Sequence, residues 1–395
     1  MDSLPNGGTT FTNHLKGYQN LLLDAKAGKW TFNTFLQTEE DVMNKVGRGF
    51  AYRFYNLYVK GTDLFDFMDF KLGRQYISAG AGRGTVDGAY IKMKFGKDKE
   101  YQLIGYGGEL TPLDYDFQKY SAINKNYTLG GQFLYYGVKD LSLGLSYFSK
   151  NRKPDSYYAM RADSLYNTTQ ILVETDSRAD QQAGFDFNYT YNRIHNFYGK
   201  AYYDIRSKRL TRGEFNFNTA LTKTLRVSGG YLYREPQISY NTIFWVFTNK
   251  ANQEVQLGFD NMFCNNINVY ARLASVLYEN DHSIRLTAGV SHPAYGISYS
   301  KYFGYAGESD GFSGYLSHEL VKSKLALTGS LNYSTYYLGD YGTDRINTLG
   351  GLLGFTYRPM PRLSVDLQGQ MMTNRIYKYD TRFLIGFNYW LFSKL

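Results

Sequence analysis

The chain has 395 residues, of which 18% are aromatic and 43% hydrophobic, yet its mean hydropathy is only -0.44. Its single cysteine, Cys264, excludes an internal disulfide, a thiolate zinc site and a CxxCH haem attachment. The formal net charge of +9 is scattered, with no basic run beyond residues 206–209, which argues against nucleic-acid binding. The core of a soluble protein would favour Leu, Ile and Val. The wall of a membrane barrel, with lipid on one side and water on the other, instead accommodates many aromatic residues while the mean hydropathy of the chain stays polar.

Apolar and polar residues alternate with period 2 in many segments, which predicts strands with one face in an apolar environment. The pattern is clear at 141–147, 183–191, 363–371 and 383–391. In the second of these, Ala183, Phe185, Phe187, Tyr189 and Tyr191 share one face. Related patterns occur at 89–95, 215–221, 225–233, 255–259, 267–273, 284–290, 295–299, 325–333 and 349–357.

The connections between these segments also alternate, between short turns and longer loops. Short turns are expected at 26–28, 96–99, 139–140, 193–196, 322–323 and 358–362, and longer loops at 111–126, 153–180, 236–252 and 336–346. Short periplasmic turns and longer extracellular loops are typical of outer-membrane barrels. The sequence therefore predicts an all-β, antiparallel, up-and-down transmembrane barrel of about 20 strands (18–22), with an even total expected. Residues 15–395 form this single domain, and residues 1–14 are an N-terminal segment that can hold an extra strand.

The face opposite the apolar one is expected to line a hydrated lumen. Small and hydrogen-bonding residues occupy it, including Thr128, Gly130, Gln132, Asn216, Asn218, Gln256, Gly258, Thr328, Ser330 and Asn332. The alternation also places charged side chains there: Lys71, Lys92, Lys94, Lys200, Arg206, Arg226, Arg272, Arg285, Asp69, Asp186, Asp204, Asp260 and Asp366. Because cationic rings favour anions, these residues predict mild anion selectivity. Alternatively, they pair across the wall and simply replace solvent.

The segment from Phe70 to Gln75, which contains Gly73-Arg74-Gln75, is followed by a Gly-rich stretch that reaches Gly84 and Asp87-Gly88. This element resembles outer-membrane porins of the alginate-export type and, more loosely, the barrel component of porin–cytochrome conduits. The resemblance covers about twenty residues. It implies an outer-membrane channel, and its second form implies a sheath around a multihaem cytochrome.

Two functions follow as alternatives. One is a porin that passes small polar or anionic solutes through a hydrated lumen; the other is a structural sheath that holds a cytochrome for transmembrane electron transfer. With about 22 strands a barrel normally needs a plug. The lumen is therefore expected to be constricted by a loop such as 153–180 or filled by a partner protein. The chain itself is expected to bind no cofactor and no metal.

The expected location is the bacterial outer membrane, with lipids, lipopolysaccharide and the outer-membrane insertion machinery as partners. The final strand, 382–392, is similar to the signal that this machinery reads, although Ser393-Lys394-Leu395 follow its last aromatic residue. These three residues also match a peroxisomal address, which a barrel alternation disfavours. Residues 1–4 show no signal-peptide layout and suggest a trimmed mature sequence, so export is inferred.

Catalysis is not expected. The chain has five histidines, His14, His195, His282, His292 and His318, and most fall in predicted turns or at strand ends. Only His318, beside Glu319, suggests an acid–base pair. No Gly-x-Ser-x-Gly elbow, HExxH helix or phosphate-binding loop occurs in the sequence.

Overall fold

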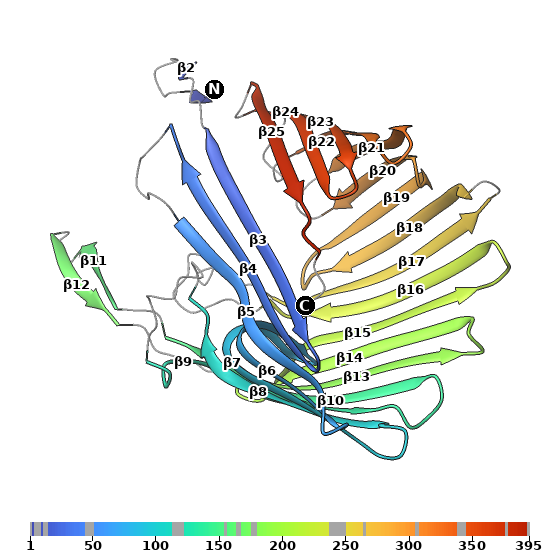
Figure 1. Ribbon diagram of the computed structural model, residues 1–395. Helices are drawn as coiled ribbons and strands as arrows, with labels where there is room; N and C mark the ends of the chain where they lie inside the picture. The colour runs from blue at the N-terminus through green and yellow to red at the C-terminus, as the bar shows by residue number, and fades with distance from the viewer. Residues whose placement is uncertain are drawn as a thin grey trace.

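A computed structural model gives the architecture (Figure 1). The structure describes residues 2–3, 9–10, 15–43, 51–112, 122–153, 156–162, 167–174, 180–236, 250–263, 266–304, 308–337, 345–375 and 378–392. Within them, 25 strands are defined. Cys264 and His14, discussed above, lie outside the described residues. Among the described residues, no helix has the length and hydropathy of a membrane span.

The first strands are β1 (Asp2–Ser3), β2 (Thr9–Thr10), β3 (Lys16–Ala27), β4 (Trp30–Asp41), β5 (Ala51–Leu64), β6 (Met68–Ala79), β7 (Gly82–Phe95), β8 (Tyr101–Leu110), β9 (Asn126–Tyr135), β10 (Leu141–Arg152), β11 (Tyr157–Ala162) and β12 (Thr168–Val173). The remaining strands are β13 (Asp180–Tyr191), β14 (His195–Asp204), β15 (Arg209–Ala220), β16 (Leu225–Arg234), β17 (Asn252–Met262), β18 (Asn268–Leu277), β19 (His282–His292), β20 (Tyr295–Gly304), β21 (Ser309–Val321), β22 (Leu325–Tyr336), β23 (Ile346–Met360), β24 (Leu363–Thr373) and β25 (Asp380–Tyr389).

One closed barrel contains β3–β10 and β13–β25, which are eight and thirteen strands, 21 in all among the described residues. Consecutive strands pair antiparallel, and β25 lies next to β3 in the ring. The predicted all-β antiparallel barrel and its range of 18–22 strands are confirmed. The expected even total does not hold for the described strands, and β3 and β25 consequently run in the same direction.

The two rims of the barrel differ as predicted. On one rim, the connections are at most five residues long, as at 96–100 and 136–140. On the other, they reach 17 residues at 235–251 and 27 residues at 153–179, the segment that holds β11 and β12. We call these the short-turn rim and the long-loop rim. By the usual arrangement of outer-membrane barrels, the long-loop rim is extracellular.

The hairpin of β11 and β12 does not constrict the lumen. Its two strands pair only with each other, and Figure 1 shows them extending away from the barrel. Tyr158 and Met160 on this hairpin are 67% and 64% exposed, so its side chains are not packed against the wall. The expectation that loop 153–180 folds into the lumen is therefore wrong for the described part of that loop.

The hairpin of β6 and β7 is the element that folds inward. Its tip is a two-residue turn on the long-loop rim, between Ala79 and Gly82, and both strands curl away from the wall in Figure 1. Side chains from the hairpin pack against β8, β10 and β14 in one buried apolar cluster. Its members are Ile77, Ala79, Ala81, Val86, Ile104, Tyr106, Phe148 and Tyr202. Since strands on different sides of a barrel can meet only through its interior, this cluster identifies the inner face of each strand.

The alternation read from the sequence agrees with that assignment. Tyr202 and Lys200 share the inner face of β14, and the strand registers extend this face to Glu214, Gln256 and Arg272. The opposite, outward face is rich in exposed apolar side chains, among them Phe185, Phe215, Leu257, Leu273, Leu331, Leu353, Phe383 and Phe387. The predicted apolar face at 183–191 is accordingly the outward one.

Candidate functional site

A row of glycines marks the line along which the wall folds inward. Gly73, Gly88 and Gly108 lie directly opposite one another on β6, β7 and β8. At Gly73, φ is +120° and an added Cβ would lie 2.3 Å from the carbonyl oxygen of Leu57. At Gly88, an added Cβ would lie 2.1 Å from the carbonyl oxygen of Gly107. The backbones approach too closely for any side chain, so the sheet can bend sharply along this row.

Arg74 lies where β6 separates from β5. Pairing between these strands ends at Leu57 and Arg74, after which β6 continues into the inward hairpin. The Arg74 guanidinium donates from Nε to Asp87 Oδ1 at 2.7 Å and from Nη2 to Asp87 Oδ2 at 2.9 Å. It also donates from Nη1 to the carbonyl oxygen of Phe54 on β5 at 3.2 Å. One guanidinium therefore connects β5, β6 and β7 at the fork, the point where β6 separates from β5, and it binds Asp87 in the bidentate geometry that arginine provides.

Gln75 is shielded at the base of the hairpin, with 1% of its surface exposed. Its Nε2 donates to the carbonyl oxygen of Gly88 at 3.2 Å and to that of Lys71 at 3.4 Å. The Gly73-Arg74-Gln75 element thus has a structural explanation. Gly73 permits the bend, Arg74 connects β5, β6 and β7 where β6 leaves β5, and Gln75 donates to backbone carbonyls at the base of the hairpin.

The tip of the hairpin is held against the inner faces of β10, β13 and β14. The Ser146 hydroxyl accepts a hydrogen bond from the Ala81 amide at 3.0 Å. The Tyr202 hydroxyl lies 3.1 Å from both the Gly80 carbonyl oxygen and Asp186 Oδ1, so it donates to either of these acceptors. These contacts, together with the apolar cluster, fill one side of the interior.

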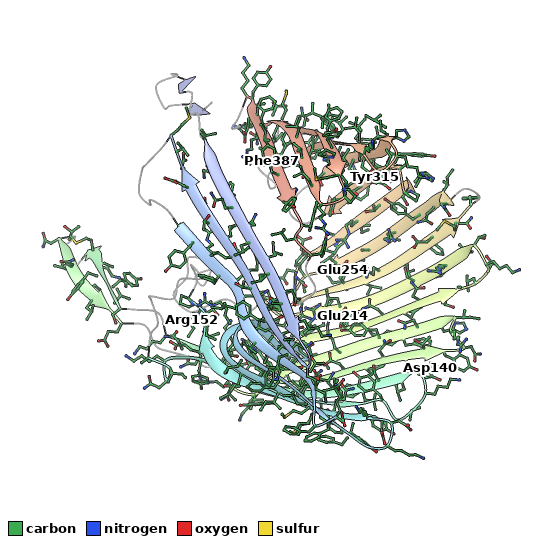
Figure 2. All side chains as sticks on the ribbon, in the orientation of Figure 1. Asp140, Arg152, Glu214, Glu254, Tyr315 and Phe387 are labelled. Atoms are coloured by element: carbon green, nitrogen blue, oxygen red, sulfur yellow. The ribbon has the colours of Figure 1, made fainter. Side chains whose placement is uncertain are left out.

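The rest of the inner face is mainly polar, and much of it is accessible to solvent. Gln256, Arg272, Thr328 and Asn332 are all exposed on it. Glu214 and Glu254, labelled in Figure 2, belong to β15 and β17 of this part of the wall. A hollow of about 190 Å³ opens in it, lined mainly by Asn196, Asn216, Asn218, Ser228, Gln256 and Arg272.

Six of the thirteen predicted lumen charges, four cations and two aspartates, form ion pairs with described residues. Lys200 Nζ is 3.1 Å from Glu214 Oε2, Arg272 Nη2 is 3.1 Å from Asp260 Oδ1, and Arg285 Nη2 is 2.5 Å from Glu254 Oε1. Lys94 bonds Asp63 at 2.7 Å and Asp69 at 3.0 Å. Asp366 accepts from Thr356 and Asn388, each at 2.6 Å. The structure therefore favours pairing across the wall for these side chains.

Two of the predicted acidic residues have other partners. Asp186 is bonded to Tyr202 as described above, and Asp204 accepts backbone amides of the next turn, from Arg206 at 2.8 Å and Ser207 at 3.0 Å. Arg206 itself lies in that turn between β14 and β15, on the long-loop rim. Its prediction as part of an inward strand face is wrong, because β14 already ends at Asp204.

A few inward cations lie outside these pairs. Among the described residues, Arg226, Lys92 and Lys71 take part in no ion pair within 4 Å. Lys71 Nζ instead lies over the rings of Tyr58 and Tyr90, at 5.5 and 5.2 Å from their centroids. Such cation–π contacts stabilise an ammonium without neutralising its charge.

Lys60 was not identified from the sequence. It lies directly opposite Lys71 on β5, in a register that brings both side chains to the same inner face. Like charges at opposed positions destabilise a sheet. The inward position of Lys60 was not predicted because Gly61 and Thr62 interrupt the alternation of apolar and polar residues that follows it.

His318 and Glu319 do not form an acid–base pair. They are adjacent on β21, and adjacent residues of a strand point to opposite faces. Their partners across the sheet are Leu327 and Ala326. The one pairing that suggested catalysis is therefore absent from this strand.

Comparisons with known proteins support the fold and no particular family. No family model matches the chain, and no curated protein matches it in sequence. The Pseudomonas aeruginosa protein FpvA, solved with heterologous pyoverdines, superposes with a TM-score of 0.51 at 11% identity, covering 90% of this chain and 65% of FpvA. A mutant of the ferric enterobactin receptor PfeA from the same organism gives a TM-score of 0.51 at 10% identity, covering 93% and 66%.

The translocation pore of the P pilus usher PapC matches over more of its own length, with 95% of this chain and 94% of PapC covered, at a TM-score of 0.48 and 9% identity. The chain spans about two thirds of the two receptors. At these identities the similarity concerns architecture. The chain has the fold of outer-membrane β-barrels.

Proposed function

We propose that the protein is an outer-membrane channel for small polar solutes. The observation that carries this proposal is the asymmetry of the interior. One side is filled by the β6–β7 hairpin and its apolar cluster, whereas the inner face of β15–β24 carries exposed polar side chains such as Gln256 and Asn332. Polar groups that face one another across an interior are best satisfied by water, so a hydrated path runs along this side.

A mild preference for anions is part of the proposal. It rests on Arg226, Lys92 and the opposed Lys60 and Lys71, since most other inner charges are neutralised by neighbouring carboxylates. The field in the lumen is therefore weak and positive. A strongly selective filter would need a ring of unpaired charges, which the described inner face does not present.

Planar bilayers test the channel directly. The purified full chain is expected to give stable single-channel steps whose current is linear in voltage, with a reversal potential under a KCl gradient that favours chloride. An absence of conductance, in preparations that show the heat-dependent gel mobility of a folded barrel, would contradict the channel. A reversal potential of the opposite sign would contradict only the anion preference.

A sheath around a cytochrome is the alternative. The inward hairpin occupies part of the space that a lumen-filling partner would need, which favours the channel. Purification from native membranes discriminates between the two functions. A particle with Soret absorbance and a second, haem-bearing chain would contradict the channel and support the sheath. A colourless particle with conductance supports the channel.

A further inference from the structure

The outward face of β17–β21 contains an apolar hollow of about 610 Å³. Its centre is formed by two small side chains, Ala271 and Ala288, which lie opposite each other on β18 and β19. They belong to one cross-strand row with Phe259 on one side and Tyr299 and Phe312 on the other. Large side chains therefore border a groove whose floor is made of alanines, on the face that the barrel turns toward lipid.

A charged cluster continues this groove toward the long-loop rim. The Tyr299 hydroxyl, whose ring lines the groove, donates to Asp310 Oδ1 at 2.6 Å. The other carboxylate oxygen of Asp310 accepts from Lys301 Nζ at 3.0 Å and from Arg345 Nη1 at 3.3 Å. Lys301 and Asp310 are two residues beyond Tyr299 and Phe312 on their strands, so they share the outward face.

The second carboxylate near these cations is held loosely. Glu308 Oε2 is 3.8 Å from Lys301 Nζ and 3.9 Å from Arg345 Nη2, and the Glu308 side chain is 50% exposed. These distances exceed those of a hydrogen bond. Two cations therefore share one close carboxylate, Asp310, and the position between them is open to exchange with a stronger anion.

We propose that this outward surface binds a phosphate-bearing acylated lipid of the outer leaflet. An acyl chain lies in the groove over Ala271 and Ala288, and the phosphate replaces Glu308 between Lys301 and Arg345. Two features select this occupant: the groove is almost wholly apolar, and two cations, Lys301 and Arg345, stand at its end toward the long-loop rim. Phosphate pairs more strongly with a lysine and an arginine than a loosely placed carboxylate does. The inference rests on the location in the outer membrane and is independent of the channel proposal.

Native mass spectrometry of the full chain with purified lipid A, which carries two phosphates, tests the site. The wild type is expected to retain lipid A. Ala288→Phe fills the groove and is expected to lower the affinity for lipid A about tenfold, roughly the effect of two buried methylene groups. Ala201→Phe, on the outward face of β14, is the matched control and is expected to bind as the wild type does.

The phosphate contact is tested by Lys301→Gln combined with Arg345→Gln, which does not depend on the groove variant folding. This double variant is expected to lose the preference for lipid A over its dephosphorylated form, while Lys250→Gln, an ion-paired cation near the same rim, keeps it. Equal binding of both lipids by the wild type, or an unchanged preference in the double variant, would overturn the phosphate site. A lipid-free dimer that Ala288→Phe dissociates would overturn the lipid in favour of a contact between copies.

Discussion

Arg74 and Asp87 form a bidentate ion pair in which the arginine side chain is 0% exposed and the aspartate side chain 15% exposed. They lie on neighbouring strands of the one hairpin that leaves the wall. Because Arg74 also reaches the carbonyl oxygen of Phe54, the pair ties the hairpin to the strand from which it departs. We therefore expect the position of the hairpin, and with it the width of the lumen, to depend on this contact.

Removing one partner of the pair should destabilise the barrel. Arg74→Gln leaves the Asp87 carboxylate without its shielded partner, and we expect a loss of about 3–5 kcal/mol in urea unfolding. Arg272→Gln, whose ion pair with Asp260 is half exposed, is the control and should cost less than about 1 kcal/mol. Equal effects of the two substitutions would mean that the fork is not held by this pair.

Gly73→Ala tests the bend itself. The φ of +120° and the approach to Leu57 leave no room for a methyl group, so we expect a loss of about 1–3 kcal/mol and less folded barrel after refolding. Gly350→Ala is the matched control, because an added Cβ there meets nothing within 4 Å. Heat-dependent mobility on gels measures the folded fraction of each variant. If Gly73→Ala folded as well as the wild type, the sheet would not need a glycine at this position in order to bend.

A disulfide tests whether the hairpin tip lies inside. A Cβ added at Gly184 would be 3.2 Å from the Cβ of Ala81, slightly inside the 3.5–4.5 Å of disulfides, and 2.5 Å from Ser146 Oγ, so every variant of this test also carries Ser146→Ala. In a Cys264→Ser background, Ala81→Cys with Gly184→Cys should therefore form a crosslink that a reductant reverses, seen as a mobility shift. Ala159→Cys with Gly184→Cys should give none, since β11 extends away from the barrel.

The opposed lysines should contribute to ion selectivity. Lys60→Gln with Lys71→Gln removes two inner positive charges that take part in no ion pair among the described residues, so the reversal potential under a KCl gradient should move toward cations. Lys139→Gln, in a turn on the short-turn rim, is the control. If both variants retain the wild-type value, the anion preference does not arise at this pair.

The barrel could be predicted because its signal is local. Most strands from 183–191 to 383–391 carry their own alternation, because lipid outside and water inside impose the same period on each of them. The faces of Lys200, Asp260 and Arg272 followed from that period alone. Arg206 was misplaced because alternation continues into Asp204 and gives no sign of where β14 ends.

The shape of the interior could not be predicted in the same way. The lumen was expected to be constricted by a loop such as 153–180 or filled by a partner protein, whereas the element that enters it is a hairpin with a turn of only two residues. Its inward course depends on Gly73, Gly88 and Gly108 lying in one row, and that row exists only once the register of three strands is known. Ion pairing was also hidden, since partners such as Arg285 and Glu254 are 31 residues apart.

The odd number of described barrel strands has a topological consequence. β3 begins at the long-loop rim and β25 ends at the short-turn rim, so the chain enters the ring at one end of its height and leaves it at the other. In a circular permutant, the segment that joins β25 to β3 would have to span the height of the wall, which takes about ten extended residues. β3 and β25 are also the neighbours with the greatest separation in sequence, so bringing them together carries the largest loop-closure cost in the ring.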